Sequence, residues 1–253
     1  MRIGLVLVTY AHHPAKLIAS VGGTPHDLSW YIHHHGPDEA FAERVQALAR
    51  ETGAVLHMHR INRGLARSWN EGLHQSFRAG AEISLLVNDD LAFVDDGFGR
   101  FAALMEGAGP VGLGFLHGLE TGGSPYAGQV LQQGFACCAI TPRAIERVGY
   151  FDETFRPAYY EDCDYFRRCV LADVPMLTMD GVAVEHERSR TTRTNPEIRS
   201  RNADIMRVNR AYYTAKWGGD PEHETFGRPF DREAYDLSIP WERRAKPYPH
   251  RAA

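Results

Sequence analysis

The sequence has few cysteines, no long apolar run and no excess of positive charge over its 253 residues. Its cysteines, Cys137, Cys138, Cys163 and Cys169, show no CxxC spacing, which argues against zinc clusters and against a disulfide framework. No apolar run approaches the roughly 20 residues that cross a bilayer, and the first residues lack a signal-peptide pattern. The net charge of −4 does not indicate a protein that binds nucleic acid or anionic membranes over its whole surface. We therefore expect an intracellular protein, in the cytoplasm or peripherally at a membrane.

The remaining composition is that of an ordinary globular chain, with 43% hydrophobic and 24% charged residues. No linker and no internal repeat divides the sequence. We expect a single domain over residues 1–219, with a first half at 1–91 and a second half at 92–219. Residues 220–253 are rich in proline and are expected to form a C-terminal tail.

The first half alternates short apolar runs with amphipathic segments. The apolar runs predict strands at 3–8, 28–34, 54–58 and 85–91, and the segments between them predict helices at 14–21, 38–51 and 65–79. Strands and helices in strict succession favour parallel βαβ units with right-handed crossovers. The first half is therefore expected to form a Rossmann-like, mostly parallel sheet flanked by helices.

The second half has a less regular pattern, which predicts a smaller lobe of mixed structure. The expected helices lie at 95–106, 142–149, 160–171 and 202–217. The expected strands lie at 111–116, 129–141, 176–178 and 182–184, with a loop at 120–128. The whole chain is thus expected to belong to the α/β class.

Asn88-Asp89-Asp90 follows the last apolar run of the first half. The carboxyl ends of parallel strands open onto the ligand crevice of an α/β sheet. Two adjacent carboxylates repel each other there unless a cation lies between them, and Mg²⁺ or Mn²⁺ favours oxygen ligands of this kind. The alternative interpretation is a capped turn, because Asn and Asp often follow a strand for that reason alone.

The segment from Asn62 to Gly72 follows the third predicted strand and enters a helix at Gly64. Backbone N–H groups and the helix dipole could face an anion there, and the amides of Asn62 and Asn70 could turn toward the same ligand. An ordinary helix cap with a surface helix behind it is the alternative.

Acidic residues open the helix expected at 160–171. A carboxylate in a crevice can act as general base on a hydroxyl, and Glu161, Asp162 and Asp164 are candidates. Acids in a first helical turn are also favoured by the helix dipole alone, so the spacing does not decide which of them is catalytic. His186 emerges at the end of a predicted strand among polar residues, as a functional histidine can.

Two further clusters are ambiguous. His33-His34-His35 and the pair His57 and His59 suggest zinc, but no cysteine or carboxylate completes a tight ligand spacing, so a dedicated zinc site is not expected. Seven arginines lie between residues 188 and 210, where they could hold a diphosphate or form a solvated face.

Four motifs in sequence order resemble the inverting glycosyltransferases of family 2, which use nucleotide-sugar donors and have the GT-A fold. The motifs are Val8-Thr9-Tyr10, Asn62-x-Gly64…Asn70-x-Gly72, Asn88-Asp89-Asp90, and Gly149-Tyr150-Phe151-Asp152-Glu153…Glu161-Asp162-x-Asp164. The resemblance extends from Ile3 to about His186, with a weaker echo at 209–218.

The resemblance implies a role for each matching residue. Thr9 and Tyr10 would line the nucleoside pocket, and Asn62, Gly64 and Asn70 would border the nucleotide and its ribose. Asn88 would contact the nucleotide sugar, Asp89 would lie near the ribose or the metal, and Asp90 would hold Mn²⁺ or Mg²⁺ with His186, which would contact the metal or the diphosphate. Asp162, with Glu161 as the next candidate, would be the catalytic base. One departure concerns the base-reading acid after the second strand, where only the displaced Asp38 is available.

The resemblance therefore implies a metal-dependent enzyme that moves a sugar from a UDP- or dTDP-sugar to an acceptor hydroxyl in a carbohydrate or glycoconjugate. The arginine-rich segment is also compatible with a lipid-linked, phosphorylated or nucleic-acid acceptor. The sequence does not indicate the oligomeric state. A nucleotidyltransferase is one alternative, although Ala11-His12-His13-Pro14 lacks the Gly-rich basic loop that it would need. A non-catalytic module that binds nucleotide sugars or polyanions is the other.

Overall fold

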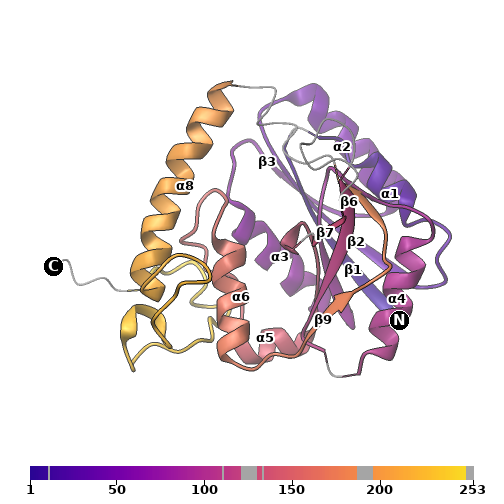
Figure 1. Ribbon diagram of the computed structural model, residues 1–253. Coiled ribbons are helices and arrows are strands. Elements are labelled where there is room, and N and C mark those ends of the chain that lie inside the picture. Colours follow the sequence, from indigo (N-terminus) through magenta and orange to yellow (C-terminus); the bar gives the residue numbers. More distant parts are fainter. Residues whose placement is uncertain (11, 110, 121–129, 133, 187–195, 249–253) are drawn as a thin grey trace.

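The computed structural model describes residues 1–10, 12–109, 111–120, 130–132, 134–186 and 196–248 (Figure 1). Its centre is a ten-stranded sheet with the order β3-β2-β1-β4-β8-β6-β10-β5, and β7 and β9 also pair with β6. The strands are β1 (Arg2–Thr9), β2 (Asp27–His35), β3 (Val55–His59), β4 (Ile83–Asn88), β5 (Leu91–Phe93), β6 (Leu113–Glu120), β7 (Val130–Gln132), β8 (Cys137–Ile140), β9 (Met176–Met179) and β10 (Val184–His186).

Helices cover both faces of the sheet (Figure 1). They are α1 (Ala15–Ser20), α2 (Glu39–Thr52), α3 (Leu65–Arg78), α4 (Gly97–Gly107), α5 (Pro142–Val148), α6 (Glu161–Leu171) and α8 (Pro196–Trp217), with short 3₁₀ turns η1 (Gly134–Ala136) and η2 (Pro229–Asp231). Among the described helices, none is both long and apolar enough to cross a membrane.

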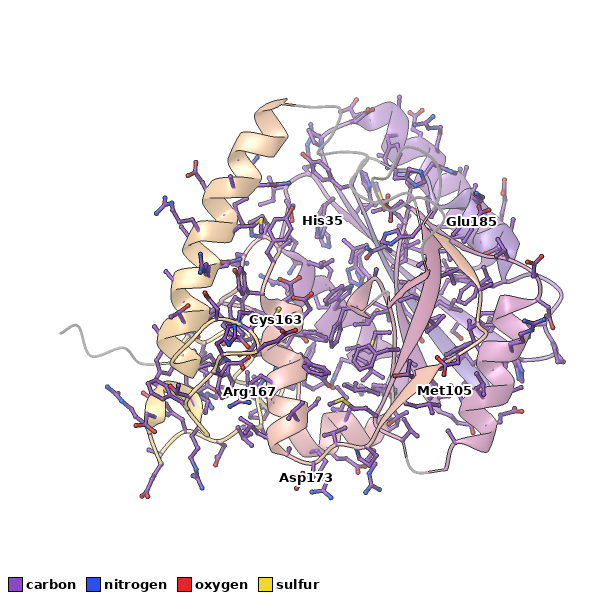
Figure 2. The ribbon with its side chains drawn as sticks, in the orientation of Figure 1. His35, Met105, Cys163, Arg167, Asp173 and Glu185 are labelled. Atoms are coloured by element: carbon purple, nitrogen blue, oxygen red, sulfur yellow. The ribbon has the colours of Figure 1, made fainter. Side chains whose placement is uncertain are left out.

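The alternation of side chains along β1 divides the core into two layers, because successive residues of a strand point to opposite faces. Ile3, Leu5 and Leu7 pack on the side of α1, α2 and α4, in one buried cluster. Val6 packs on the opposite side, in a second buried cluster that contains Trp69 of α3 and side chains of α5 and α6. Side chains fill both layers between sheet and helices (Figure 2).

The predicted α/β class is confirmed, and so is the division into a parallel and a mixed part. Strands β1 to β4 pair in parallel, as expected for βαβ units. The mixed part begins where β8 pairs with β4 in the antiparallel direction, and β8 in turn pairs antiparallel with β6.

Two predicted strands are divided in the structure. The run at 85–91 is strand β4, a turn at Asp89-Asp90, and the separate strand β5, which begins at Leu91. The run at 129–141 is divided by η1 into β7 and β8. An apolar run alone does not reveal such a break, because its periodicity continues across it. Most of the expected loop at 120–128 lies outside the described residues.

The C-terminal residues up to 248 pack against the second half of the chain. The Ile239 carbonyl accepts a hydrogen bond from the Tyr150 amide (2.8 Å), and the Arg244 carbonyl accepts one from the Glu153 amide (2.9 Å). Tyr248 is buried, with the Lys216 Nζ atom 4.8 Å from its ring centroid. This tail therefore supports the segment that precedes α6.

Candidate active site

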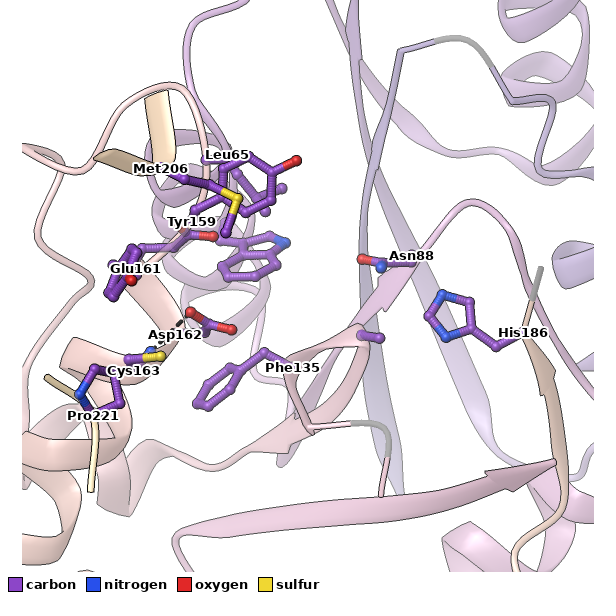
Figure 3. A pocket seen from close by; sticks show the side chains of 14 residues that line it. Leu65, Asn88, Phe135, Tyr159, Glu161, Asp162, Cys163, His186, Met206 and Pro221 are labelled. Carbon is purple, nitrogen blue, oxygen red and sulfur yellow. Dashed lines mark hydrogen bonds between the residues drawn. The ribbon is translucent and has the colours of Figure 1, made fainter. Parts of the chain in front are cut away.

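A cavity of about 510 Å³ opens between β4, β10 and the start of α6. Asn88 at the end of β4 and His186 at the end of β10 lie on one side, and Glu161 and Asp162 of α6 lie on the other (Figure 3). Four candidates from three distant segments of the sequence thus line one pocket. The other lining residues are Leu65, Trp69, Phe135, Ala136, Ala158, Tyr159, Tyr160, Cys163, Met206 and Pro221.

The pairing of β5 with β10 brings Asp90 and His186 together. Leu91 pairs with His186 across this antiparallel ladder, so Asp90 lies at the end of the same ladder. The distance between Asp90 Oδ1 and His186 Nε2 is 3.1 Å, and both side chains are largely shielded from solvent. A carboxylate oxygen and an imidazole nitrogen at this spacing can both ligate one divalent cation.

The first turn of α6 orients its three acids differently. Glu161 and Asp164 are buried, at 3% and 0% exposure, whereas Asp162 is half-buried and lines the cavity. Asp164 is bonded to Arg168 Nε (3.0 Å) and to Trp217 Nε1 (2.9 Å), so it is part of the core. Asp162 is therefore the acid whose exposure best suits a base acting on a bound substrate.

The surroundings of Glu161 favour its neutral, protonated form. Burial, and next the charge of Asp162, raise its pKa well above the ordinary value of 4.5, and its Oε2 atom has no hydrogen-bond partner in the described structure. Because the folded chain holds this proton more tightly than the unfolded chain, Glu161 lowers stability progressively as the pH rises above 4.5.

Glu161→Gln should therefore raise the melting temperature relative to the native chain, by an amount that grows as the pH rises above the ordinary pKa of 4.5. Glutamine has the shape of the protonated acid but never has to lose a proton. Thermal unfolding at several pH values measures the difference. A difference that stays constant with pH would show that Glu161 is ionised to the same extent in both states.

A smaller cavity of about 170 Å³ adjoins the first and shares Leu65 and Ala158 with it. Its lining includes Tyr10, Asn62 and Asp89, three of the residues predicted to contact the nucleotide. His35 of β2 lies there as well, a residue that the sequence did not indicate for this role.

Asp89 lines the smaller cavity, and Thr9 lies behind it at the end of β1. Thr9 is fully buried, and its hydroxyl donates a hydrogen bond to the His12 carbonyl (2.7 Å). Burial, and next the neighbouring Asp90 charge, raise the pKa of Asp89 to about 7, although bonding to Thr9 opposes the shift. Thr9 thus supports the cavity wall from behind, while Asp89 and the half-exposed Tyr10 face the cavity.

Two predicted nucleotide contacts lie elsewhere. Asn70 is fully buried, and its amide bonds to both the N–H (2.8 Å) and the carbonyl (3.0 Å) of Phe151 and to Glu153. It holds the segment before α6 against α3, and because it is fully buried and both of its N–H donors are paired, it does not face a ligand. Asp38 caps α2 by accepting from the Phe41 amide (3.0 Å), at a separate surface hollow.

At the start of α3 the structure shows the helix-cap interpretation rather than free N–H groups at Gly64 and Leu65. The Gly64 amide donates to Asn62 Oδ1 (2.9 Å), and the Leu65 amide donates to the Pro157 carbonyl (2.7 Å). These N–H groups are therefore already paired. Gly64 has φ +97°, a conformation that glycine adopts without strain, so its role is to turn the chain into α3.

The turn that precedes α6 has a strained backbone and is held in place by α8. Tyr159 and Tyr160 precede Glu161 with φ values of 81° and 72°, which is unfavourable for aromatic residues. The buried Asn209 of α8 holds this strained turn, since its amide donates to the carbonyls of Ala158 (2.8 Å) and Tyr159 (3.0 Å). Of the arginine-rich segment at 188–210, residues up to 195 lie outside the described part of the chain, whereas Arg207 and Arg210 lie on α8 and pair with Asp204 and Asp220.

No protein-family model matches this sequence, and no curated protein sequence matches it. Several solved structures are similar to this chain. TarS of S. aureus in complex with UDP is 13% identical with a TM-score of 0.58, over 74% of this chain and 60% of that one. The mannosyltransferase PcManGT of Pyrobaculum calidifontis, with GDP-Man and Mn²⁺, is 12% identical with a TM-score of 0.52, over 76% and 59%.

A third similar structure is GalNAc-T7 with UDP, GalNAc and Mn²⁺, at 9% identity and a TM-score of 0.55, over 74% of this chain and 44% of that one. The chain thus spans about three fifths or less of the length of these structures. Identity this low is informative about the fold alone. The chain has the fold of these structures, and the GT-A architecture expected from its motifs is confirmed.

Proposed function

We propose that this protein is a metal-dependent, inverting glycosyltransferase that uses a UDP- or dTDP-sugar. The observation that carries the proposal is the single cavity in which Asn88 and His186 face Asp162 (Figure 3). A donor diphosphate on the first side and an acceptor hydroxyl on the second would meet in this cavity. The activities of similar folds, among them a mannosyltransferase, support transfer of a sugar.

The smaller cavity is proposed to hold the nucleoside. Tyr10 offers an aromatic ring for stacking, and Asn62 and Asp89 offer polar groups to a base or ribose. Because Leu65 and Ala158 line both cavities, a nucleotide bound there would extend its diphosphate toward Asn88. Similar structures contain UDP or GDP-Man, which supports a nucleotide of this size.

Asp90 and His186 are proposed to hold the divalent cation, Mn²⁺ or Mg²⁺. Their 3.1 Å separation and their oxygen and nitrogen donors fit a cation whose other positions are filled by diphosphate oxygens and water. Such a cation would neutralise charge that develops on the leaving nucleoside diphosphate. Mn²⁺ in the structures of PcManGT and GalNAc-T7 supports this assignment.

Asp162 is proposed as the general base. It would take the proton of the acceptor hydroxyl while that oxygen attacks the anomeric carbon and the bond from carbon to diphosphate oxygen breaks. A single displacement from the face opposite the leaving group inverts the configuration at that carbon. Glu161 is buried, and its raised pKa favours the protonated acid, which is a much weaker base than a carboxylate.

Asp90→Asn should weaken metal-dependent nucleotide binding by about tenfold or more, because one charged ligand of the cation is lost. Isothermal calorimetry with UDP or dTDP in the presence and absence of Mn²⁺ measures the effect. Asp95→Asn is the matched control, since Asp95 is exposed a few residues further along the chain. The proposal fails if neither nucleoside diphosphate binds the native chain under either condition.

A further inference from the structure

A second group of metal-ligating side chains lies on the sheet face beneath α3, outside the proposed active site. β2 and β3 are parallel and in register, so that His33 pairs with His57 and His35 pairs with His59. Residues two apart point to the same face of a strand, and four imidazoles therefore gather on one side. The rings of His33 and His57 are stacked with centroids 4.6 Å apart. His35 is labelled in Figure 2.

Helix α3 provides polar partners for this histidine group. The Ser68 hydroxyl bonds to His35 Nε2 (2.9 Å), and the Gln75 amide bonds to His57 Nε2 (3.0 Å). Glu71, between these two on the helix, brings its carboxylate to 3.9 Å from His33 Nδ1. The sequence indicated no acid beside these histidines, because Glu71 is remote in the chain and reaches them only through the packing of α3.

His33 is the member of the group that its surroundings do not satisfy. It is 0% exposed, and neither ring nitrogen has a hydrogen-bond partner among the described residues. A buried polar group without a partner is costly, and such an exception calls for an explanation such as a bound ion. Since neither ring nitrogen of His33 is engaged, a neutral imidazole here would have a lone pair available to a metal.

We propose that His33, His59 and Glu71 form a zinc site separate from the cation site of Asp90 and His186. Their ligand atoms all lie within 4.8 Å of one another. Two imidazoles and one carboxylate are a common zinc ligand set, with the fourth position open to water. Such nitrogen-rich ligands favour Zn²⁺ over Mg²⁺, which prefers oxygen.

Arg63 occupies the position next to these ligands in the structure. Its Nη1 atom lies 3.2 Å from His59 Nε2, and its Nη2 atom lies 3.0 Å from Glu71 Oε1. A guanidinium that bridges an imidazole and a carboxylate competes directly with a metal for both. Arg67 also bonds to Glu71 (3.2 Å) and can stay paired to it when Arg63 moves away. Zinc therefore replaces Arg63 as the cation of the site.

The site joins β2, β3 and α3 at the base of the segment that carries Asn62. This segment lies between His59 and Leu65 and lines the proposed nucleoside cavity. A metal bound to the folded chain alone raises its stability by mass action. We therefore expect Zn²⁺ to raise the melting temperature whether or not the protein transfers sugars.

The test uses metal-free protein carrying His186→Ala, so that the proposed cation site of the active site does not contribute. Zn²⁺ titrated by calorimetry should bind with one equivalent, and Co²⁺ should give the visible absorption of a tetrahedral site. Glu71→Gln and His59→Gln should each weaken Zn²⁺ binding by at least about tenfold, because a ligand is lost. Arg63→Gln should strengthen it, since the competing cation is gone.

His26→Gln is the matched control, because His26 also lies beside a carboxylate, Glu106, but away from this group. It should leave Zn²⁺ binding unchanged. Glu71 and His59 are only half-buried, so their variants should fold even where a substitution at the buried His33 does not. The proposal is overturned if no Zn²⁺ binds saturably, or if Glu71→Gln and His59→Gln bind it as tightly as the parent.

Discussion

Asp162→Asn should lower the rate of sugar transfer by about 10²–10⁴-fold, the usual contribution of a general base. The amide keeps the shape of the carboxylate but cannot accept the proton of the acceptor hydroxyl. The same loss can be measured as hydrolysis of the nucleotide sugar, a reaction in which water replaces the acceptor. Binding of the nucleotide should change little, because Asp162 lies across the cavity from Asn88 (Figure 3).

Glu161→Gln provides the control for this experiment. Glu161 is adjacent in the chain and lines the same cavity, but its proton is held tightly by burial, which raises its pKa. Substitution by an amide should therefore preserve most of the turnover. If Glu161→Gln abolishes transfer and Asp162→Asn does not, the two acids have the opposite roles.

Lys216→Met should lower the free energy of unfolding by about 3–5 kcal/mol at neutral pH, as expected when one partner of a buried ion pair is removed. Lys216 is fully buried, and its Nζ atom lies 2.8 Å from Asp152 Oδ2 and 2.6 Å from Asp164 Oδ1. The variant leaves both carboxylates buried with less positive charge near them. Urea denaturation measures the loss.

The pH dependence of this loss identifies its cause. Burial alone would raise the pKa of Asp152, but the charge of Lys216 together with hydrogen bonds from Lys216 and Thr154 lowers the pKa. The stabilising contribution of Asp152 is therefore present above its unfolded pKa and disappears as the pH falls through its lower folded pKa. Without Lys216 the carboxylate can take up a proton in acid, so the cost of the substitution should shrink as the pH falls.

Two further variants show whether the stability is lost because buried carboxylates lose their partner or because any substitution destabilises α8. Lys216→Met combined with Asp152→Asn should recover part of the lost stability, because one orphaned carboxylate is removed. Arg207→Met, which breaks an exposed pair with Asp204 on the same helix, should change stability by less than ~0.5 kcal/mol. Equal losses for Lys216→Met and Arg207→Met would contradict the buried network.

Local sequence patterns were sufficient for the parallel half of the fold. The strand at 28–34 and the helix at 38–51 were predicted within about two residues, because each has its own apolar periodicity and its own end signal. The break between β4 and β5 was missed. It depends on pairing between Leu91 and His186, which are far apart in the chain, and no local signal records that pairing.

The candidate site was predictable for residues at the ends of strands and at the start of α6, and not for residues inside the packing. Asn88, Asp162 and His186 converge on one cavity as expected from their motifs. Asn70 matched a motif equally well, but its buried amide is hydrogen-bonded to the Phe151 backbone, a partner that only the tertiary structure reveals. Glu71 was overlooked beside the histidines for the same reason.

The most direct test of the proposed function is the product formed from a panel of UDP- and dTDP-sugars with Mn²⁺. The native chain should release nucleoside diphosphate and a sugar of inverted configuration from at least one donor, and Asp162→Asn should release far less. Release of pyrophosphate would indicate nucleotidyl transfer. Binding of a nucleotide sugar without release of any nucleoside diphosphate, with or without acceptors present, would contradict the assignment of this cavity as a glycosyltransferase active site.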